Sequence, residues 1–128
     1  MRWCALVLGL VVVACGGPDR ETFVRDANTA CRDRAAGQEA LGALPRDELL
    51  AASTALYEQE LARLKALEPP AEDRAEHARW VRANAEVVTA WRRYAADSGS
   101  KAARKRVLER FDHAAELAGE LGLAQCDG

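Results

Sequence analysis

Residues 80–91 read WVRANAEVVTAW, and their apolar side chains recur with the period of an α-helix. Trp80 and Trp91 are eleven residues apart, close to three helical turns, so both are expected on one face. Asn84, Val87 and Val88 fall on the same face. The spacing predicts a helix over residues 71–97 whose buried side carries the largest apolar area of the domain.

Three other segments show the same periodicity. They cover residues 21–41, 46–67 and 101–121. Asp19 or Thr22 is the expected N-cap of the first segment, and Gly122 is expected to end the last one in a left-handed conformation. Short breaks rich in glycine, proline or serine separate the segments, and none alternates like a β-strand. This pattern predicts an all-α fold, an antiparallel up-down four-helix bundle.

Each of these three segments has an apolar stripe. The stripe residues are Phe23, Ala27, Ala30 and Leu41 in the first, Leu50, Thr54, Tyr57, Leu61 and Leu64 in the second, and Ala103, Val107, Phe111, Ala114, Ala118 and Leu121 in the last. Arg34 interrupts the first stripe. Asn84, on the tryptophan face, is interpreted as a buried polar group that fixes helix register, with a ligand contact as the alternative.

The first residues have the features of a secretory signal. A positive start, Met1-Arg2, precedes an apolar run that is too short to span a bilayer. The run ends in Val12-Val13-Ala14-Cys15, which resembles the lipobox of bacterial lipoproteins. The resemblance implies cleavage after Ala14 and attachment of fatty acyl chains to Cys15, two of which suffice for stable anchoring. An ordinary signal peptide that contains a cysteine, or a retained helix, is the alternative.

The lipobox resemblance divides the chain into a cleaved signal peptide (1–14), a lipidated tether (15–20) and a helical bundle domain (21–128). The expected location is a bacterial cell envelope, with the protein held on a membrane by its lipid. Gly16 after the anchor favours the outer membrane, facing the periplasm, if the bacterium is Gram-negative. With 18 basic and 20 acidic residues, the chain lacks the positive balance of a nucleic-acid-binding protein.

The four cysteines have different expected fates. Cys4 leaves with the signal and Cys15 carries the lipid. In an oxidising envelope the remaining two, Cys31 and Cys126, are expected to form one disulfide, with a metal site or free thiols as the alternative. They lie 95 residues apart, and the chain-entropy description assigns about 4–5 kcal/mol to closing such a loop.

Three further pieces of the chain resemble a loose class of small helical bacterial exported proteins and lipoproteins of unassigned function. The pieces are Phe23-x3-Ala27-x2-Ala30-Cys31, Leu61-x2-Leu64-x2-Leu67-Glu68-Pro69-Pro70 and Leu121-Gly122-Leu123-x2-Cys126. The resemblance implies a helical, disulfide-closed lipoprotein. It implies no catalytic residue.

No pattern in the sequence indicates catalysis or a cofactor. The candidate hydroxyls are Ser53, Ser98 and Ser100, and none lies in a Gly-x-Ser-x-Gly turn. His77 and His113 are interpreted as surface or structural residues, because the chain lacks the paired Glu-x-x-His motifs of a di-metal bundle. A metal site that uses these histidines is the alternative. We therefore expect no enzyme activity, no cofactor and no metal.

Residues 92–110 contain seven basic and two acidic residues, whereas the remainder of the mature chain is acidic. The basic residues are Arg92, Arg93, Lys101, Arg104, Lys105, Arg106 and Arg110. In the predicted bundle they surround the turn between the third and fourth helices, at the end opposite the lipid tether. Such a segment attracts an anionic glycan, a lipid headgroup surface or an acidic protein. A solvated charged face is the alternative interpretation.

The sequence thus predicts a lipid-anchored cell-envelope protein with a non-catalytic interaction or scaffolding role. Its expected partners are the membrane, through the lipid, and an anionic envelope component or acidic protein, through the basic segment. Nucleic acid is not an expected partner. The alternative is a periplasmic helical bundle that binds a small ligand or a metal.

Overall fold

The computed structural model describes residues 18–128. The expected signal peptide, Cys15 and the first part of the tether therefore lie outside the described residues. Within them the helices are α1 (Arg20–Leu41), α2 (Arg46–Ala66), the 3-10 turn η1 (Ala71–Asp73), α3 (Arg74–Ala96) and α4 (Lys101–Glu120). The four predicted helices are confirmed, with one correction: residues 71–73 form a 3-10 turn, so the third α-helix begins at Arg74.

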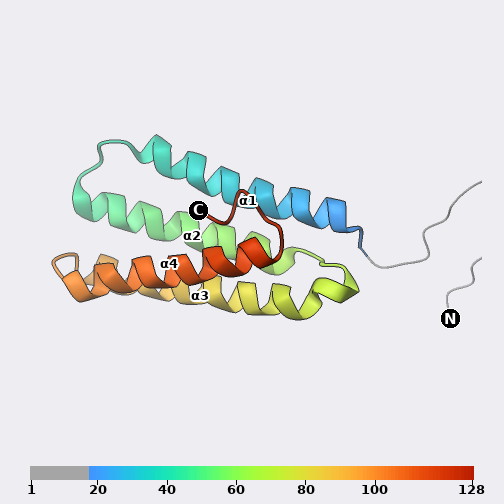
Figure 1. The fold of residues 1–128 in the computed structure, drawn as a ribbon. Helices are drawn as coiled ribbons and strands as arrows, with labels where there is room; N and C mark the ends of the chain where they lie inside the picture. The colour runs from blue at the N-terminus through green and yellow to red at the C-terminus, as the bar shows by residue number, and fades with distance from the viewer. Residues whose placement is uncertain (1–17) are drawn as a thin grey trace, which may run out of the picture.

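The four helices form an antiparallel bundle (Figure 1). α1 and α3 run in one direction and α2 and α4 in the other, so the α1–α2 and α3–α4 turns lie at the same end. The guanidinium of Arg46 ties these turns together by donating to the hydroxyl of Tyr94 and the carbonyl of Ser98, at 3.0 and 2.6 Å. The opposite end holds the start of α1 and the α2–α3 connection (Figure 1). The predicted fold class is confirmed.

The C-terminal segment, residues 121–128, closes the bundle between the first and last helices, whose backbones stay apart. No Cα atom of α1 lies within 8 Å of one of α4. The segment instead turns back to α1, where the backbone N–H of Gln125 donates to the Asn28 side chain at 3.0 Å. Leu121 and Leu123, within this segment, are fully buried.

Local sequence signals set the ends of the helices. The carboxylate of Asp19 accepts from the backbone N–H of Glu21, which makes Asp19 the N-cap of α1. The hydroxyl of Ser100 accepts from the N–H of Ala103 in the same way at the start of α4. Gly122 has a φ of 73°, the left-handed conformation expected after the last helix.

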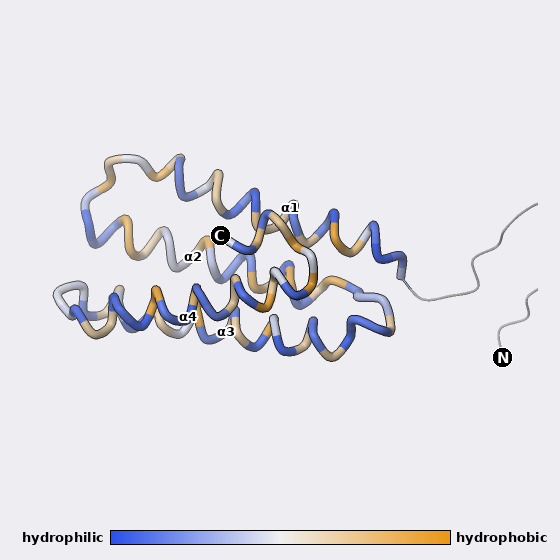
Figure 2. The backbone as a smooth tube through the Cα atoms, in the orientation of Figure 1, coloured by the Kyte–Doolittle hydropathy of each residue, from blue (hydrophilic) through white to orange (hydrophobic). Residues whose placement is uncertain are grey.

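The core runs along the bundle axis, and Figure 2 shows hydrophobic and hydrophilic positions alternating along the helices. Trp80 is 1% exposed and is one of the largest fully buried side chains. Trp91 is only partly buried, although the sequence placed both tryptophans in the core, and its ring stacks on Tyr57 with the centroids 5.3 Å apart. Leu41, expected on the buried stripe of α1, also lies outside the core clusters.

Candidate functional site

Cys31 and Cys126 form a disulfide, as predicted. Their Cα atoms are 5.3 Å apart, and both residues are buried. Cys31 lies in α1 and Cys126 in the C-terminal segment, so the bond holds that segment on α1. The described residues contain no free cysteine.

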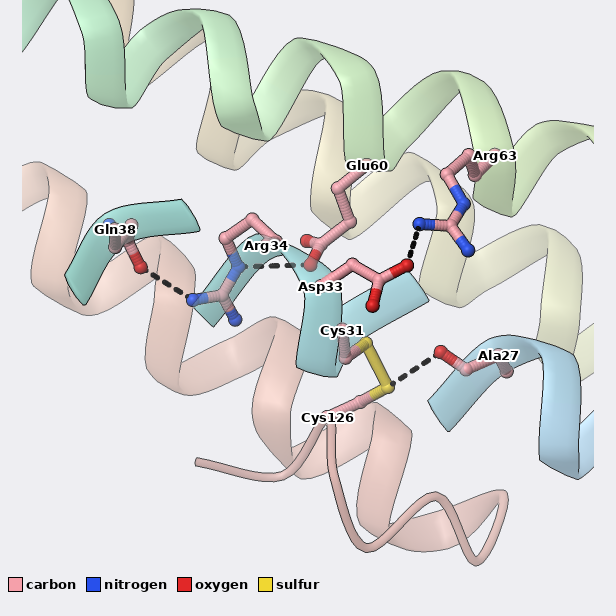
Figure 3. A network of polar contacts seen from close by, with 8 residues as sticks. All are labelled: Ala27, Cys31, Asp33, Arg34, Gln38, Glu60, Arg63 and Cys126. Carbon is pink, nitrogen blue, oxygen red and sulfur yellow. Dashed lines mark hydrogen bonds and ion pairs between the residues drawn. A yellow bond between two sulfur atoms is a disulfide. The ribbon is translucent and has the colours of Figure 1, made fainter. Parts of the chain in front are cut away.

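A buried polar network that the sequence analysis did not predict lies beside the disulfide (Figure 3). The guanidinium of Arg34 on α1 donates to the carboxylate of Glu60 on α2 at 2.9 Å and to the side-chain oxygen of Gln38 at 2.6 Å. The Glu60 side chain is 4% exposed. The interruption of the α1 stripe at Arg34 is therefore the site of an ion pair between helices.

Aromatic rings extend this network to all four helices. The Arg34 guanidinium lies 4.8 Å from the ring centre of Tyr57 on α2 and 5.7 Å from that of Phe111 on α4. Such positions favour a cation electrostatically. Trp91 of α3 stacks on Tyr57, and its indole Nε1 is buried with no hydrogen-bond partner among the described residues.

The sequence contained a signal for the ion pair. Tyr57, Glu60 and Leu64 are spaced by three and four residues, so they fall on one side of the second helix. Ala27, Ala30 and Arg34 fall on one side of the first helix for the same reason. Opposite charges on the buried stripes of two consecutive antiparallel helices indicate a pair, provided that the helical register brings them level.

Burial raises the pKa of the Glu60 carboxyl above its ordinary value, although the positive charge of Arg34 opposes the shift. Burial likewise raises the pKa of Tyr57. Only a small hollow of about 80 Å³ adjoins the ion pair, far below the size of a typical ligand pocket. The charged groups of Arg34 and Glu60 bond to each other and to Gln38, so we assign this network a structural role.

The two histidines occupy different environments. His77 is buried, and its Nε2 lies 2.9 Å from the carbonyl oxygen of Leu64, which only accepts, so that nitrogen carries the proton. His113 is exposed on α4. Within residues 18–128, no group of three or more His, Cys, Asp or Glu side chains is arranged to hold a metal ion.

Asn84 is buried, as expected, but its side-chain amide donates to the carbonyl of Trp80 within α3, at 2.9 Å. The hydrogen bond therefore stays within one helix. It satisfies a buried donor and does not itself connect Asn84 to a neighbouring helix.

The seven basic residues of segment 92–110 lie around the α3–α4 turn and the adjoining halves of both helices, and we call this region the basic end. Four of the seven form ion pairs. These pairs are Arg92 with Glu58, Arg110 with Glu86, and both Lys105 and Arg106 with Glu109. Arg93, Lys101 and Arg104 have no ion pair with any described residue. All three are exposed.

Two hollows lie between α3 and α4 at the basic end. One, of about 200 Å³, is lined by Glu86, Thr89, Ala90, Arg93, Arg106 and Arg110. The other, of about 170 Å³, is lined by Ala90, Arg93, Ala102, Ala103 and Arg106. They share three lining residues and therefore adjoin each other, and we call the two hollows together the α3–α4 groove.

Residues 18–128 thus define a small all-α protein, a four-helix bundle closed by a disulfide. Scans of the chain against models of protein families, curated proteins and solved structures found no match. In the part of the chain that the structure describes, no helix has the length and apolar character needed to cross a membrane.

Proposed function

We propose that this chain is a lipid-anchored protein of a bacterial cell envelope that binds an anionic envelope component or an acidic protein through its basic end, without catalysis. The observation that carries the proposal is the position of the basic end. The described chain enters the bundle at Asp19, and the α3–α4 turn lies at the other end (Figure 1).

This placement puts the expected lipid anchor and the proposed partner-binding surface at opposite ends of the bundle. α3 has 23 residues, and a helix rises about 1.5 Å per residue, so the two ends of the bundle are roughly 30 Å apart. A lipid on Cys15 would hold the first end at its membrane. The basic end would then face away from that membrane, where exposed cations attract anionic partners.

The exposed cations of α4 strengthen the proposal. Lys101, Arg104 and Lys105 are exposed in the first turns of this helix, and Leu108, one helical turn further on, is 56% exposed. Clustered exposed cations attract anionic partners electrostatically, and Leu108 adds one apolar side chain to the same helix face. We call these four residues the outer face of α4.

The anchor is tested by the mass of the mature amino terminus. For the natural chain we expect a product that begins at Cys15 and carries fatty acyl chains, found in the membrane fraction. With Cys15→Ser we expect neither the acyl mass nor membrane retention. A natural product that is soluble and unmodified would overturn the anchor.

The basic end is tested by crosslinking in intact cells. Replacing Lys101, Arg104 and Lys105 with glutamine should greatly reduce recovery of the crosslinked partner. The matched control replaces Arg32, Arg74 and Arg79, three exposed arginines outside the basic end, and removes the same charge. Equal recovery with both triple variants would overturn the binding role, because both remove three positive charges but only one removes them from the basic end.

A further inference from the structure

The α3–α4 groove combines three guanidinium groups with small apolar side chains. Arg93, Arg106 and Arg110 line its larger hollow together with a single carboxylate, that of Glu86. The charged lining residues therefore sum to a net charge of two positive. A singly charged carboxylate leaves half of this charge unbalanced, whereas a phosphate monoester, with about 1.5 to 2 negative charges at pH 7, matches it.

Two of the three arginines, Arg93 and Arg106, have no hydrogen-bonded ion pair within residues 18–128. Arg93 is exposed and has no ion pair with any described residue. The contact between Arg106 and Glu109 is 4.0 Å long, too long for a hydrogen bond. Arg110 donates to the Glu86 carboxylate at 3.2 Å, but both side chains are partly exposed, so a phosphate can compete with Glu86 for it. Guanidinium groups bind phosphate oxygens through paired N–H donors, a geometry that lysine cannot offer.

The size and lining of the groove further restrict the ligand. A hollow of about 200 Å³ lies below the usual range for whole small molecules, so it suits one charged group. The adjoining hollow has Ala90, Ala102 and Ala103 between Arg93 and Arg106. Its small apolar side chains offer a surface for a hydrocarbon portion next to the charged group.

We propose that the α3–α4 groove binds the phosphate monoester group of an amphiphilic ligand, with Arg93, Arg106 and Arg110 around the phosphate and the three alanines beneath its apolar portion. The proposal deepens the proposed function, on which it rests for the envelope setting. It specifies a phosphate monoester as one anionic partner of the basic end. The groove that would bind this group is a different surface from the outer face of α4.

The test is an NMR titration of the mature chain, residues 15–128 with Cys15→Ser, with inorganic phosphate, butyl phosphate and butyl sulfate. We expect butyl phosphate to bind more tightly than either of the others, because only it combines the double charge with a hydrocarbon portion. The side-chain Nε–H signals of the three arginines and the amide of Ala103 should shift. Equal affinity for the three probes, or shifts spread evenly over all exposed arginines, would overturn the site.

Variants locate the binding. Arg93→Gln with Arg106→Gln should weaken butyl phosphate binding about ten-fold or more, since each charge-assisted contact is a strong one. Arg32→Gln with Arg79→Gln is the matched control and should leave the affinity unchanged. Glu86→Gln should strengthen binding several-fold, because it removes the groove carboxylate and frees Arg110, whereas Glu76→Gln, on the exposed start of α3, should not. Loss of affinity in the control pair equal to that in the groove pair would contradict the proposal.

Vesicles distinguish the source of the phosphate. If the ligand is a lipid, vesicles with phosphatidic acid should retain the chain better than vesicles with phosphatidylglycerol, a monoanionic diester, at equal surface charge. If the ligand is a soluble phosphate ester, butyl phosphate binds but the two vesicles behave alike. Both outcomes support the groove, whereas no binding of butyl phosphate and no difference between vesicles overturns it.

The outcomes also separate this proposal from the broader one. If crosslinking in cells depends on Lys101, Arg104 and Lys105 but no phosphate ester binds, the groove assignment fails and the proposed function stands. If butyl phosphate binds in the groove but crosslinking is insensitive to the triple substitution, the proposed partner role of the outer face of α4 fails and the phosphate site stands.

Discussion

The guanidinium of Arg34 and the carboxylate of Glu60 meet at 2.9 Å between α1 and α2, with 11% and 4% of their side chains exposed. This contact places a buried ion pair beside the Cys31–Cys126 disulfide (Figure 3). Both features join α1 to the rest of the bundle, and no Cα atom of α1 lies within 8 Å of one of α4. The attachment of α1 therefore depends on a few specific interactions as well as on its packing against α2.

A double-mutant cycle should show strong coupling between Arg34 and Glu60. Removing either partner leaves a buried charge without compensation, and each single replacement by methionine is expected to cost about 3 kcal/mol of unfolding free energy. The double replacement should cost much less than the sum. The matched control is the Arg92–Glu58 pair, which has a 2.8 Å contact but is exposed, and whose coupling should stay below about 1 kcal/mol. Additive effects at Arg34 and Glu60, measured by urea unfolding, would contradict the structure.

The pH dependence of stability should carry the signature of Glu60. Because burial raises its pKa above the ordinary 4.5, the folded chain holds this proton more tightly than the unfolded chain. The contribution of Glu60 is therefore complete below pH 4.5 and is lost as the pH rises through the folded-state pKa. Relative to Glu60→Gln, the natural chain should gain stability as the pH falls across that window. A stability difference that stays constant from neutral pH down through that window would show that the pKa is not raised.

Removing the disulfide should lower the free energy of unfolding and loosen one region in particular. For Cys31→Ser with Cys126→Ser we expect a loss of about 2–5 kcal/mol in denaturant unfolding. Hydrogen exchange should accelerate most at the amides of residues 123 and 126, which in the natural chain bond to the carbonyls of Ala118 in α4 and Leu123 in the C-terminal segment. The amide of Val88 in α3 serves as the internal reference. Uniform acceleration across the chain would argue against a local closing role.

Leu64 should be far more sensitive to truncation than Leu108. Leu64 is fully buried in the main core, so Leu64→Ala is expected to cost about 2–5 kcal/mol through lost burial and the cavity left behind. Leu108 is 56% exposed, and Leu108→Ala should change stability by less than about 0.5 kcal/mol. Because both variants lose the same atoms, the difference between their stability losses reports the difference in burial of the two leucines. Similar thermal shifts for the two variants would be inconsistent with this core.

Two neighbouring glycines should respond to alanine in opposite directions. Gly122 has a φ of 73°, which costs a side-chain-bearing residue about 1–2 kcal/mol, so Gly122→Ala should destabilise. Gly119 lies inside α4, and a Cβ there meets nothing within 4 Å. Gly119→Ala should therefore stabilise the chain by about 0.5–1 kcal/mol, because alanine is the better helix former. Thermal unfolding of the two variants tests both signs.

The secondary structure could be predicted because its signals are local. The apolar stripes, Asp19 before the first helix and Gly122 after the last one each act through neighbours a few residues away. The 3-10 turn at 71–73 was missed, because the double proline that precedes it indicates a helix start but not its type. Trp91 was placed in the core by spacing alone, yet its ring packs on Tyr57 at a partly buried position.

By itself, the sequence determined the four helices and their antiparallel order, because periodicity and turn residues restrict both strongly, and it predicted the pairing of Cys31 with Cys126, which the structure contains. Only the tertiary structure decided which charged residues face each other. The Arg34–Glu60 pair and the α3–α4 groove depend on the rotation and axial register of neighbouring helices. Those quantities are set by side-chain packing across the whole bundle, which no local pattern encodes.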